Sequence, residues 1–188
     1  MPDSSLRGKR ILVTHADAFM GPVLCEVLAR RGATVIPSTD ALLEPEAPAA
    51  LVAASGQVDI LVANLAIRNP RTSAIDVDEV EWREVFATLV DPLPRLCRAV
   101  LPAMIARRAG KILVMGSASA LRGIKGATTY SAARGAQLAY VQSLGVEVAA
   151  HNVQVNAIAQ NFVDNPTYFP PEVQADPRFQ DRLKREVP

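Results

Sequence analysis

Short runs of aliphatic and β-branched residues alternate along this chain with longer stretches of helical periodicity. Strands are expected at residues 10–14, 34–36, 58–63, 111–115 and 153–159, helices at 21–31, 78–89, 92–107 and 130–150, and shorter helices within 41–55 and near 178–186. This alternation favours a parallel sheet that is covered by helices on both faces. The sequence therefore predicts a doubly wound α/β protein, with a single domain over residues 1–188.

Composition and charge exclude several classes of protein. The chain is 49% hydrophobic and 21% charged with a net charge of +1, as expected for a folded globular protein. The basic residues of Arg178–Arg185 are interleaved with Asp181, which indicates a solvated helix face and not a nucleic-acid surface. Because Met1–Arg10 is polar and no run reaches about 20 apolar residues, we expect a cytoplasmic protein without a membrane segment. Cys25 and Cys97 are expected to be buried and reduced.

The loop after the first predicted strand, at residues 14–21, lies where open α/β sheets bind their ligands. A dinucleotide diphosphate needs glycines there, because only glycine lets the backbone approach the phosphates and turn tightly before the helix. This loop instead contains His15 and Phe19, with Asp17 between them and glycine only at Gly21. We therefore predict that it does not bind a nicotinamide cofactor.

Three residues with catalytic potential lie close together in the sequence pattern. Ser117 directly follows a predicted strand, and Tyr130 opens a predicted helix 13 positions later. Arg134 follows Tyr130 at i+4, so the two side chains share a helix face. A neighbouring cation favours the phenolate form of a tyrosine, and arginine supplies a permanent charge. We interpret the three residues as a catalytic set; His15 and His151 lack the spacing of a metal site.

Together these segments resemble the short-chain dehydrogenase/reductase superfamily, which has a Rossmann-like fold. Lys111–Ser119 followed by Tyr130–Arg134 is similar to the catalytic region of that family, except that Arg134 stands in place of a lysine. The family's first loop reads Thr-Gly-x-x-x-Gly-x-Gly, and two of its glycines are replaced here. Ser-Tyr-Arg joined to a glycine-poor loop is similar to the halohydrin dehalogenases, as are the strings at residues 16–21 and 159–163.

This resemblance implies a reaction without any cofactor. Ser117 would bind the hydroxyl of a vicinal haloalcohol, and Tyr130 would act as the general base. The resulting alkoxide would displace the halide on the adjacent carbon and give an epoxide, and the reverse reaction would open an epoxide with a small anion. The residues implied to line the halide and substrate pocket are Phe19, Gln160, Asn161, Phe162, Val163, Tyr168 and Phe169.

Two alternatives stay open. One is an NAD(P)-dependent short-chain oxidoreductase with a degenerate loop, although the family's helix asparagine, counted from Trp82, falls at Leu89. Asn64 ends a strand near the site, where it could simply cap a loop. The other is a truncated, non-catalytic member, because the chain stops at Pro188 whereas the family continues with a helix and a final strand. That strand is expected to be lacking, and a dimer or tetramer is implied for a full-length form.

Overall fold

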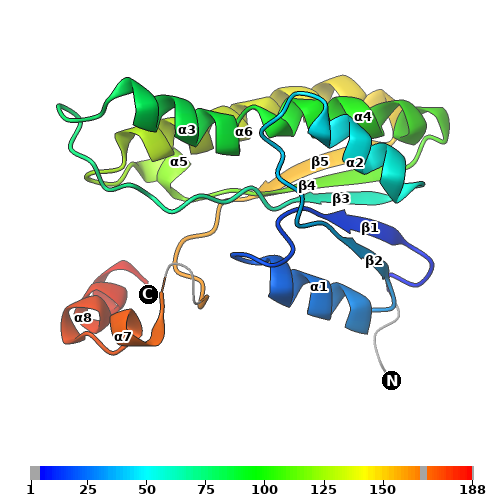
Figure 1. Cartoon of the computed structure of the whole chain (residues 1–188). Helices are drawn as coiled ribbons and strands as arrows, with labels where there is room; N and C mark the ends of the chain where they lie inside the picture. The colour runs from blue at the N-terminus through cyan, green and yellow to red at the C-terminus, as the bar shows by residue number, and fades with distance from the viewer. Residues whose placement is uncertain (1–4, 166–168, 188) are drawn as a thin grey trace.

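A computed structural model of the protein describes residues 5–165 and 169–187, and Figure 1 shows its central sheet. The sheet has five strands in the order β2-β1-β3-β4-β5, and every pairing is parallel. The strands are β1 (Arg10–Val13), β2 (Thr34–Pro37), β3 (Ile60–Ala63), β4 (Gly110–Met115) and β5 (Val153–Ile158). The predicted doubly wound α/β fold is confirmed.

Helices cover both faces of this sheet. They are α1 (Gly21–Arg30), α2 (Ala47–Ser55), α3 (Glu79–Leu89), α4 (Pro92–Ala106), α5 (Ser119–Arg122), α6 (Thr128–Val148), the 3₁₀ turn η1 (Ala149–His151), α7 (Pro171–Gln174) and α8 (Pro177–Glu186). Helix α1 lies on one face, and α2, α3, α4 and α6 lie on the other (Figure 1). The short helices α5 and α7 were not expected from the sequence. No helix in the described part of the chain is long and apolar enough to cross a membrane.

The core follows from the alternation of side chains along the strands. In β1, Leu12 joins the cluster beneath α3, α4 and α6, whereas its neighbours Ile11 and Val13 join the cluster beneath α1. All three side chains are completely buried. Because successive residues of a strand point to opposite faces, a strand that is apolar throughout fits only between two helical layers. The apolar strand segments in the sequence predicted a sheet covered on both faces for this reason.

The two cysteines lie on opposite sides of the sheet. Cys25 is in α1 and Cys97 is in α4, and both are free thiols. Burial raises the pKa of the Cys97 thiol to about 12, so this side chain stays protonated and unreactive at neutral pH. Cys97 is buried as expected, whereas Cys25 is only partly buried, and the two free thiols agree with the expected reduced state.

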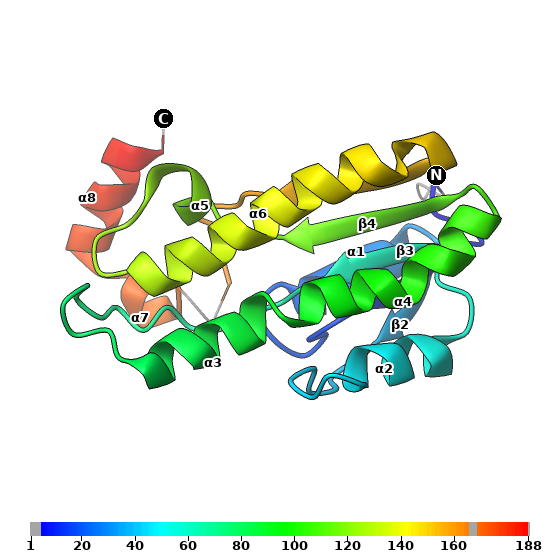
Figure 2. The ribbon, with the colours of Figure 1, turned by 90° about the horizontal axis from the view of Figure 1, so that it is seen from above.

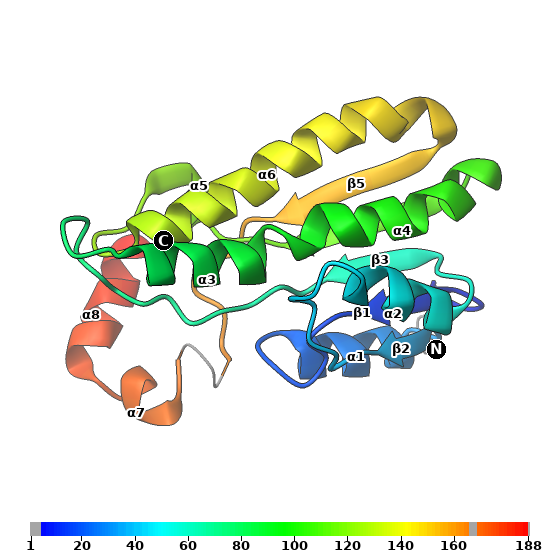
Figure 3. The same ribbon diagram turned by 45° about the horizontal axis from the view of Figure 1, so that its top comes forward.

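The loops that follow β1, β3, β4 and β5 all leave the carboxyl edge of the sheet, because the strands are parallel. Helices α7 and α8 also lie beyond this edge, at the end toward which β4 and β5 point (Figures 2 and 3). The strand order changes direction between β1 and β3, and such a switch point is where sheets of this kind bind ligands. A ligand site is therefore expected at this edge.

Candidate active site

The loop after β1 contains two non-glycine residues with left-handed backbone conformations. His15 has a φ of 44° and Phe19 a φ of 56°. Glycine adopts this conformation more readily than any other residue, and both positions are glycines in the family that the sequence resembles. The Phe19 side chain is only 8% exposed, and it lines a pocket at the carboxyl edge of the sheet. The loop thus keeps the backbone path of a glycine-rich turn while it carries two large side chains.

Asn64, at the end of β3, holds this loop in place. Its side-chain amide donates hydrogen bonds to the carbonyl oxygens of His15 at 3.0 Å and Ala18 at 3.1 Å. In return, Nδ1 of His15 donates to the Asn64 carbonyl oxygen at 2.8 Å. Asn64 is completely buried, and its own N–H donates to Oγ1 of Thr14 at 3.0 Å. The arrangement supports the structural interpretation of Asn64, and it fixes the two large side chains relative to the sheet.

Gly21, the first residue of α1, packs directly on the same loop. A Cβ atom at this position would lie 2.2 Å from the carbonyl oxygen of His15, and backbone cannot move away cheaply. Gly21→Ala is therefore expected to lower the free energy of unfolding by about 1–3 kcal/mol, measured by urea denaturation. The control is Gly135→Ala in α6, where the added Cβ meets open space and alanine is expected to add about 0.5–1 kcal/mol. A stability for Gly21→Ala equal to that of the unchanged protein would contradict the packing described.

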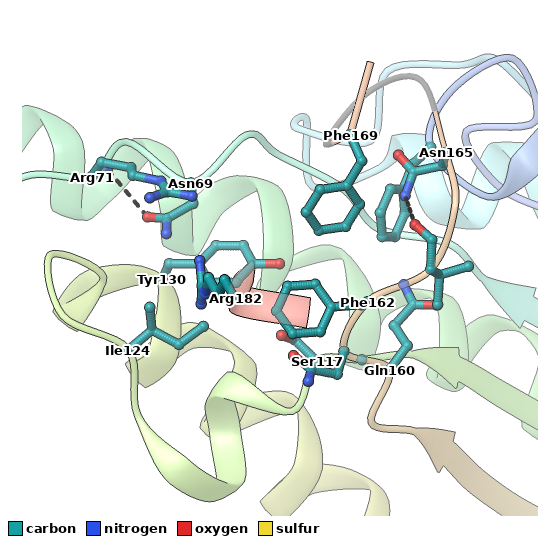
Figure 4. A pocket seen from close by; sticks show the side chains of 14 residues that line it. Asn69, Arg71, Ser117, Ile124, Tyr130, Gln160, Phe162, Asn165, Phe169 and Arg182 are labelled. Atoms are coloured by element: carbon teal, nitrogen blue, oxygen red, sulfur yellow. Dashed lines mark hydrogen bonds between the residues drawn. The ribbon is translucent and has the colours of Figure 1, made fainter. Parts of the chain in front are cut away.

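Ser117 and Tyr130 face one another across the pocket, as Figure 4 shows. Ser117 lies in the loop after β4, and its Oγ accepts a hydrogen bond from the Ser119 N–H at 3.2 Å. Tyr130 lies in the first turn of α6 and is 6% exposed, so its ring is packed and its hydroxyl is directed to the pocket. The structure therefore brings these two predicted residues into one cavity.

Arg134 lies behind Tyr130 and does not line the main pocket. Its guanidinium carbon is 5.1 Å from the centre of the Tyr130 ring, and the side chain is 1% exposed. Nη1 donates to the Met115 carbonyl oxygen and to Oε1 of Gln137, both at 2.9 Å. Nε and Nη2 have no hydrogen-bond partner, and none of the described carboxylates pairs with this charge. A buried cation without a counter-ion is costly, so an anion beside it is strongly favoured.

Gln137 connects this arginine to helix α3. Its Oε1 accepts from Arg134, and its Nε2 donates to the carbonyl oxygen of Leu89 at 2.6 Å. Leu89, the last residue of α3, is the position at which the reductases of the resembled family are expected to carry an asparagine. Sequence reasoning did not identify Gln137; its i+3 spacing from Arg134 was the available signal.

The residues implied to bind halide lie around the same cavity. The lining includes Phe19, Gln160, Asn161, Phe162, Val163 and Phe169. Tyr168 lies outside the described residues. Oδ1 of Asn161 accepts a hydrogen bond from Arg122 at 3.0 Å, which leaves the Asn161 amide N–H groups as donors. The rings of Phe162 and Phe169 lie 5.7 Å apart and form an apolar wall.

Several lining residues were not anticipated from the sequence. They are Asn69, Arg71, Gly116, Ile124, Asn165 and Arg182. Most come from irregular loops or from α8, where no periodic pattern marks a side chain as facing a cavity. The cavity measures about 110 Å³, well below the ~300–1,000 Å³ of pockets for drug-sized ligands, so it suits a small organic molecule.

Comparison with known proteins places this chain in a family. The sequence profile of the short chain dehydrogenase family matches residues 44–175. The chain belongs to the short-chain dehydrogenase/reductase family. A 3-oxoacyl-[acyl-carrier-protein] reductase of Vibrio harveyi is 30% identical over 184 residues, which cover 85% of this chain and 75% of the relative.

Two solved structures are similar to this short-chain dehydrogenase/reductase family member over almost its whole length. One, a dehalogenation enzyme, has a TM-score of 0.88 and 28% sequence identity, with 97% of this chain and 84% of the other covered. The second, a putative short-chain alcohol dehydrogenase from Sinorhizobium meliloti, has a TM-score of 0.89 and 26% identity, with 100% and 84% covered. Known relatives of the chain therefore include both reductases and a dehalogenation enzyme.

Proposed function

We propose that this protein converts vicinal haloalcohols to epoxides and halide without a cofactor, and that it opens epoxides with small anions in the reverse direction. The observation that carries the proposal is the position of Phe19. Its buried side chain comes from the loop that holds the dinucleotide in a glycine-rich family member, and it lines the same cavity as Ser117 and Tyr130. Halide chemistry needs an apolar wall at this place, whereas hydride transfer needs a nicotinamide there.

The residues of the first loop do not fit the dinucleotide that the family implies. His15 and Phe19 occupy the two positions where glycine lets backbone approach a diphosphate. The Asn64 amide holds the backbone of this loop at the carbonyl oxygens of His15 and Ala18, so the loop that carries the two side chains does not move aside at low cost. Only one helix, α2, lies between β2 and β3 in this chain. No step of the proposed mechanism therefore involves a nicotinamide.

In the proposed mechanism Tyr130 is the general base. Behind it lies the buried guanidinium of Arg134, whose carbon is 5.1 Å from the centre of the ring. Ser117 donates a hydrogen bond to the substrate oxygen and orients it. As Tyr130 takes the hydroxyl proton, the oxygen attacks the adjacent carbon, the carbon–oxygen bond forms, and the carbon–halogen bond breaks with its electron pair leaving on the halide.

The leaving halide would be stabilised in the part of the cavity that Asn161 and the phenylalanine side chains line. Asn161 lines the cavity with its Oδ1 bonded to Arg122, so its amide N–H groups would be the halide donors, and Phe19, Phe162 and Phe169 would supply the apolar lining. Donors that are fixed in place before the reaction stabilise developing charge more than water does, because they need no reorganisation. A halide held in this way is set apart from the epoxide that forms beside Ser117.

A second candidate function is supported by the sequence comparison. The Vibrio harveyi relative is a reductase, and its 30% identity extends over 85% of this chain. Under this alternative the protein is an NAD(P)-dependent oxidoreductase whose first loop accepts the cofactor in spite of His15 and Phe19. Such a protein would bind NADPH tightly, and the two candidates can be separated by one set of measurements.

The test is chloride release from 1,3-dichloropropan-2-ol, measured with and without NADPH. We expect release at the same rate in both conditions, and no change in melting temperature when NADPH or NADH is added. Release that requires NADPH, or a melting temperature that rises with dinucleotide concentration, would favour the oxidoreductase. If neither chloride release nor dinucleotide binding is found, the non-catalytic alternative is favoured.

A further inference from the structure

The cavity has an uneven distribution of charge. Its lining contains two arginines, Arg71 and Arg182, and no aspartate or glutamate among the described residues. Tyr130 on the cavity floor is 6% exposed, whereas Arg71 is exposed and the Arg182 side chain is 32% exposed. The buried part of the cavity is therefore where the chemistry is proposed, and its opening to solvent is cationic.

The guanidinium of Arg71 makes no ion pair with any of the described carboxylates. The backbone at Arg71 has a left-handed φ of 64°, and its N–H donates to Oδ1 of Asn69 at 3.2 Å. Backbone strain of this kind often occurs at ligand sites. An exposed cation on the cavity wall that pairs with no described carboxylate is available to bind an anion.

Arg182 reaches the cavity from helix α8 and is held on both sides. Its Nε donates to Oε1 of Glu186 at 2.9 Å, and its guanidinium carbon lies 5.3 Å from the centre of the Phe162 ring. Arg122 also contacts Glu186, at 3.1 Å. These hydrogen bonds from Arg182 and Arg122 hold the pKa of Glu186 below its usual range, so it stays a carboxylate. One carboxylate therefore faces two guanidinium groups, and Arg71 adds a third positive charge.

We propose that the substrate of this cavity carries a carboxylate, which Arg71 and Arg182 bind at the opening while its haloalcohol end lies between Ser117 and Tyr130. This inference rests on the proposed function and adds the substrate class. The planar fork of arginine matches the geometry of a carboxylate, and the neighbouring Asn69 amide belongs to the same wall. Figure 4 shows Arg71 and Asn69 on one side of the cavity and Phe169 on the other, while the Arg182 guanidinium lies against the Phe162 ring. The carboxylate would thus lie at the opening, beside Arg71 and Arg182.

The test compares two substrates that differ only in charge, 4-chloro-3-hydroxybutanoate and its neutral amide. We expect kcat/KM for chloride release to be about 10-fold or more higher for the carboxylate at low salt, because hydrogen bonds to charged groups are the stronger ones. Arg71→Gln should bring the ratio of the two kcat/KM values close to one. Arg68→Gln removes an exposed charge from the same loop that does not line the cavity, and it should leave the ratio unchanged. Raising the ionic strength should lower the ratio in the unchanged protein.

A second measurement separates failure of this inference from failure of the proposed function. Calorimetric titration with 3-hydroxybutanoate and 3-hydroxybutanamide tests binding without any reaction. Binding of the carboxylate that is lost in Arg71→Gln and kept in Arg68→Gln supports the site even if no chloride is released, and the proposed function then fails alone. Equal kcat/KM values for the two chlorohydrins, or equal binding of the two hydroxy compounds, would overturn the carboxylate proposal while the dehalogenation proposal stands on its own result.

Discussion

Tyr130→Phe is expected to lower chloride release from 1,3-dichloropropan-2-ol by about 10²–10⁴-fold, the usual contribution of a general base. The substitution removes only the hydroxyl of a side chain that is 6% exposed, so the packing of the ring is retained. In the variant the substrate hydroxyl can lose its proton only to water, and the protein does not hold that proton acceptor in position. The measurement is the initial rate of halide release at saturating and at low substrate concentration.

Tyr140→Phe is the matched control for this substitution. Tyr140 lies in the same helix, but it packs against the apolar cluster near Cys97 and does not line the cavity. Removal of the Tyr140 hydroxyl should leave the rate of halide release nearly unchanged. A Tyr130→Phe protein that keeps more than about a tenth of the original rate would contradict the role of Tyr130, since that loss is below the range for a general base.

Arg134→Met is expected to have the second largest effect, a decrease of about 10–10³-fold in the rate at pH 7. The buried positive charge behind the Tyr130 ring is lost, while methionine keeps much of the buried volume. The carbonyl oxygen of Met115 and Oε1 of Gln137 lose their donor, which costs about 1–3 kcal/mol of stability. Removing a buried, unpaired charge opposes this cost, so a folded protein is expected.

A variant that keeps the charge distinguishes an electrostatic role of Arg134 from a purely structural one. Arg134→Lys keeps a positive charge behind the Tyr130 ring and should lose less activity than Arg134→Met at pH 7. Equal losses of activity in both variants would show that Arg134 only supports packing.

The proposed catalytic set could be predicted from the sequence because of its local spacing. Ser117 closely follows β4, and Tyr130 and Arg134 share one face of α6. The strand and helix pattern was equally accessible, because β1 is apolar throughout and a strand of that kind is buried on both faces. These inferences depend on periodicity, which a single sequence displays.

The residues at the opening of the cavity could not be predicted from the periodicity of the sequence. Arg71 and Arg182 are more than 100 positions apart, and neither belongs to a repeating pattern of side chains. Both line one cavity because of the path of the β3–α3 loop and the placement of α8, which are determined by tertiary contacts. Arg134 shares a helix face with Tyr130 as expected, but its place behind the ring could not be predicted, because it depends on a hydrogen bond to a carbonyl oxygen of β4.

The hydrogen bonds of helix α6 determine which segments of this protein can be substituted without moving Tyr130. Arg134 and Gln137 hydrogen-bond this helix to the carbonyl oxygens of Met115 and Leu89, so the proposed general base Tyr130 is positioned by β4 and α3 and not by a loop around the cavity. Segments such as residues 66–76 could therefore be redesigned for new substrates without displacing Tyr130. Conversely, substitutions that shift the end of α3, far from any substrate, should slow catalysis while leaving affinity intact.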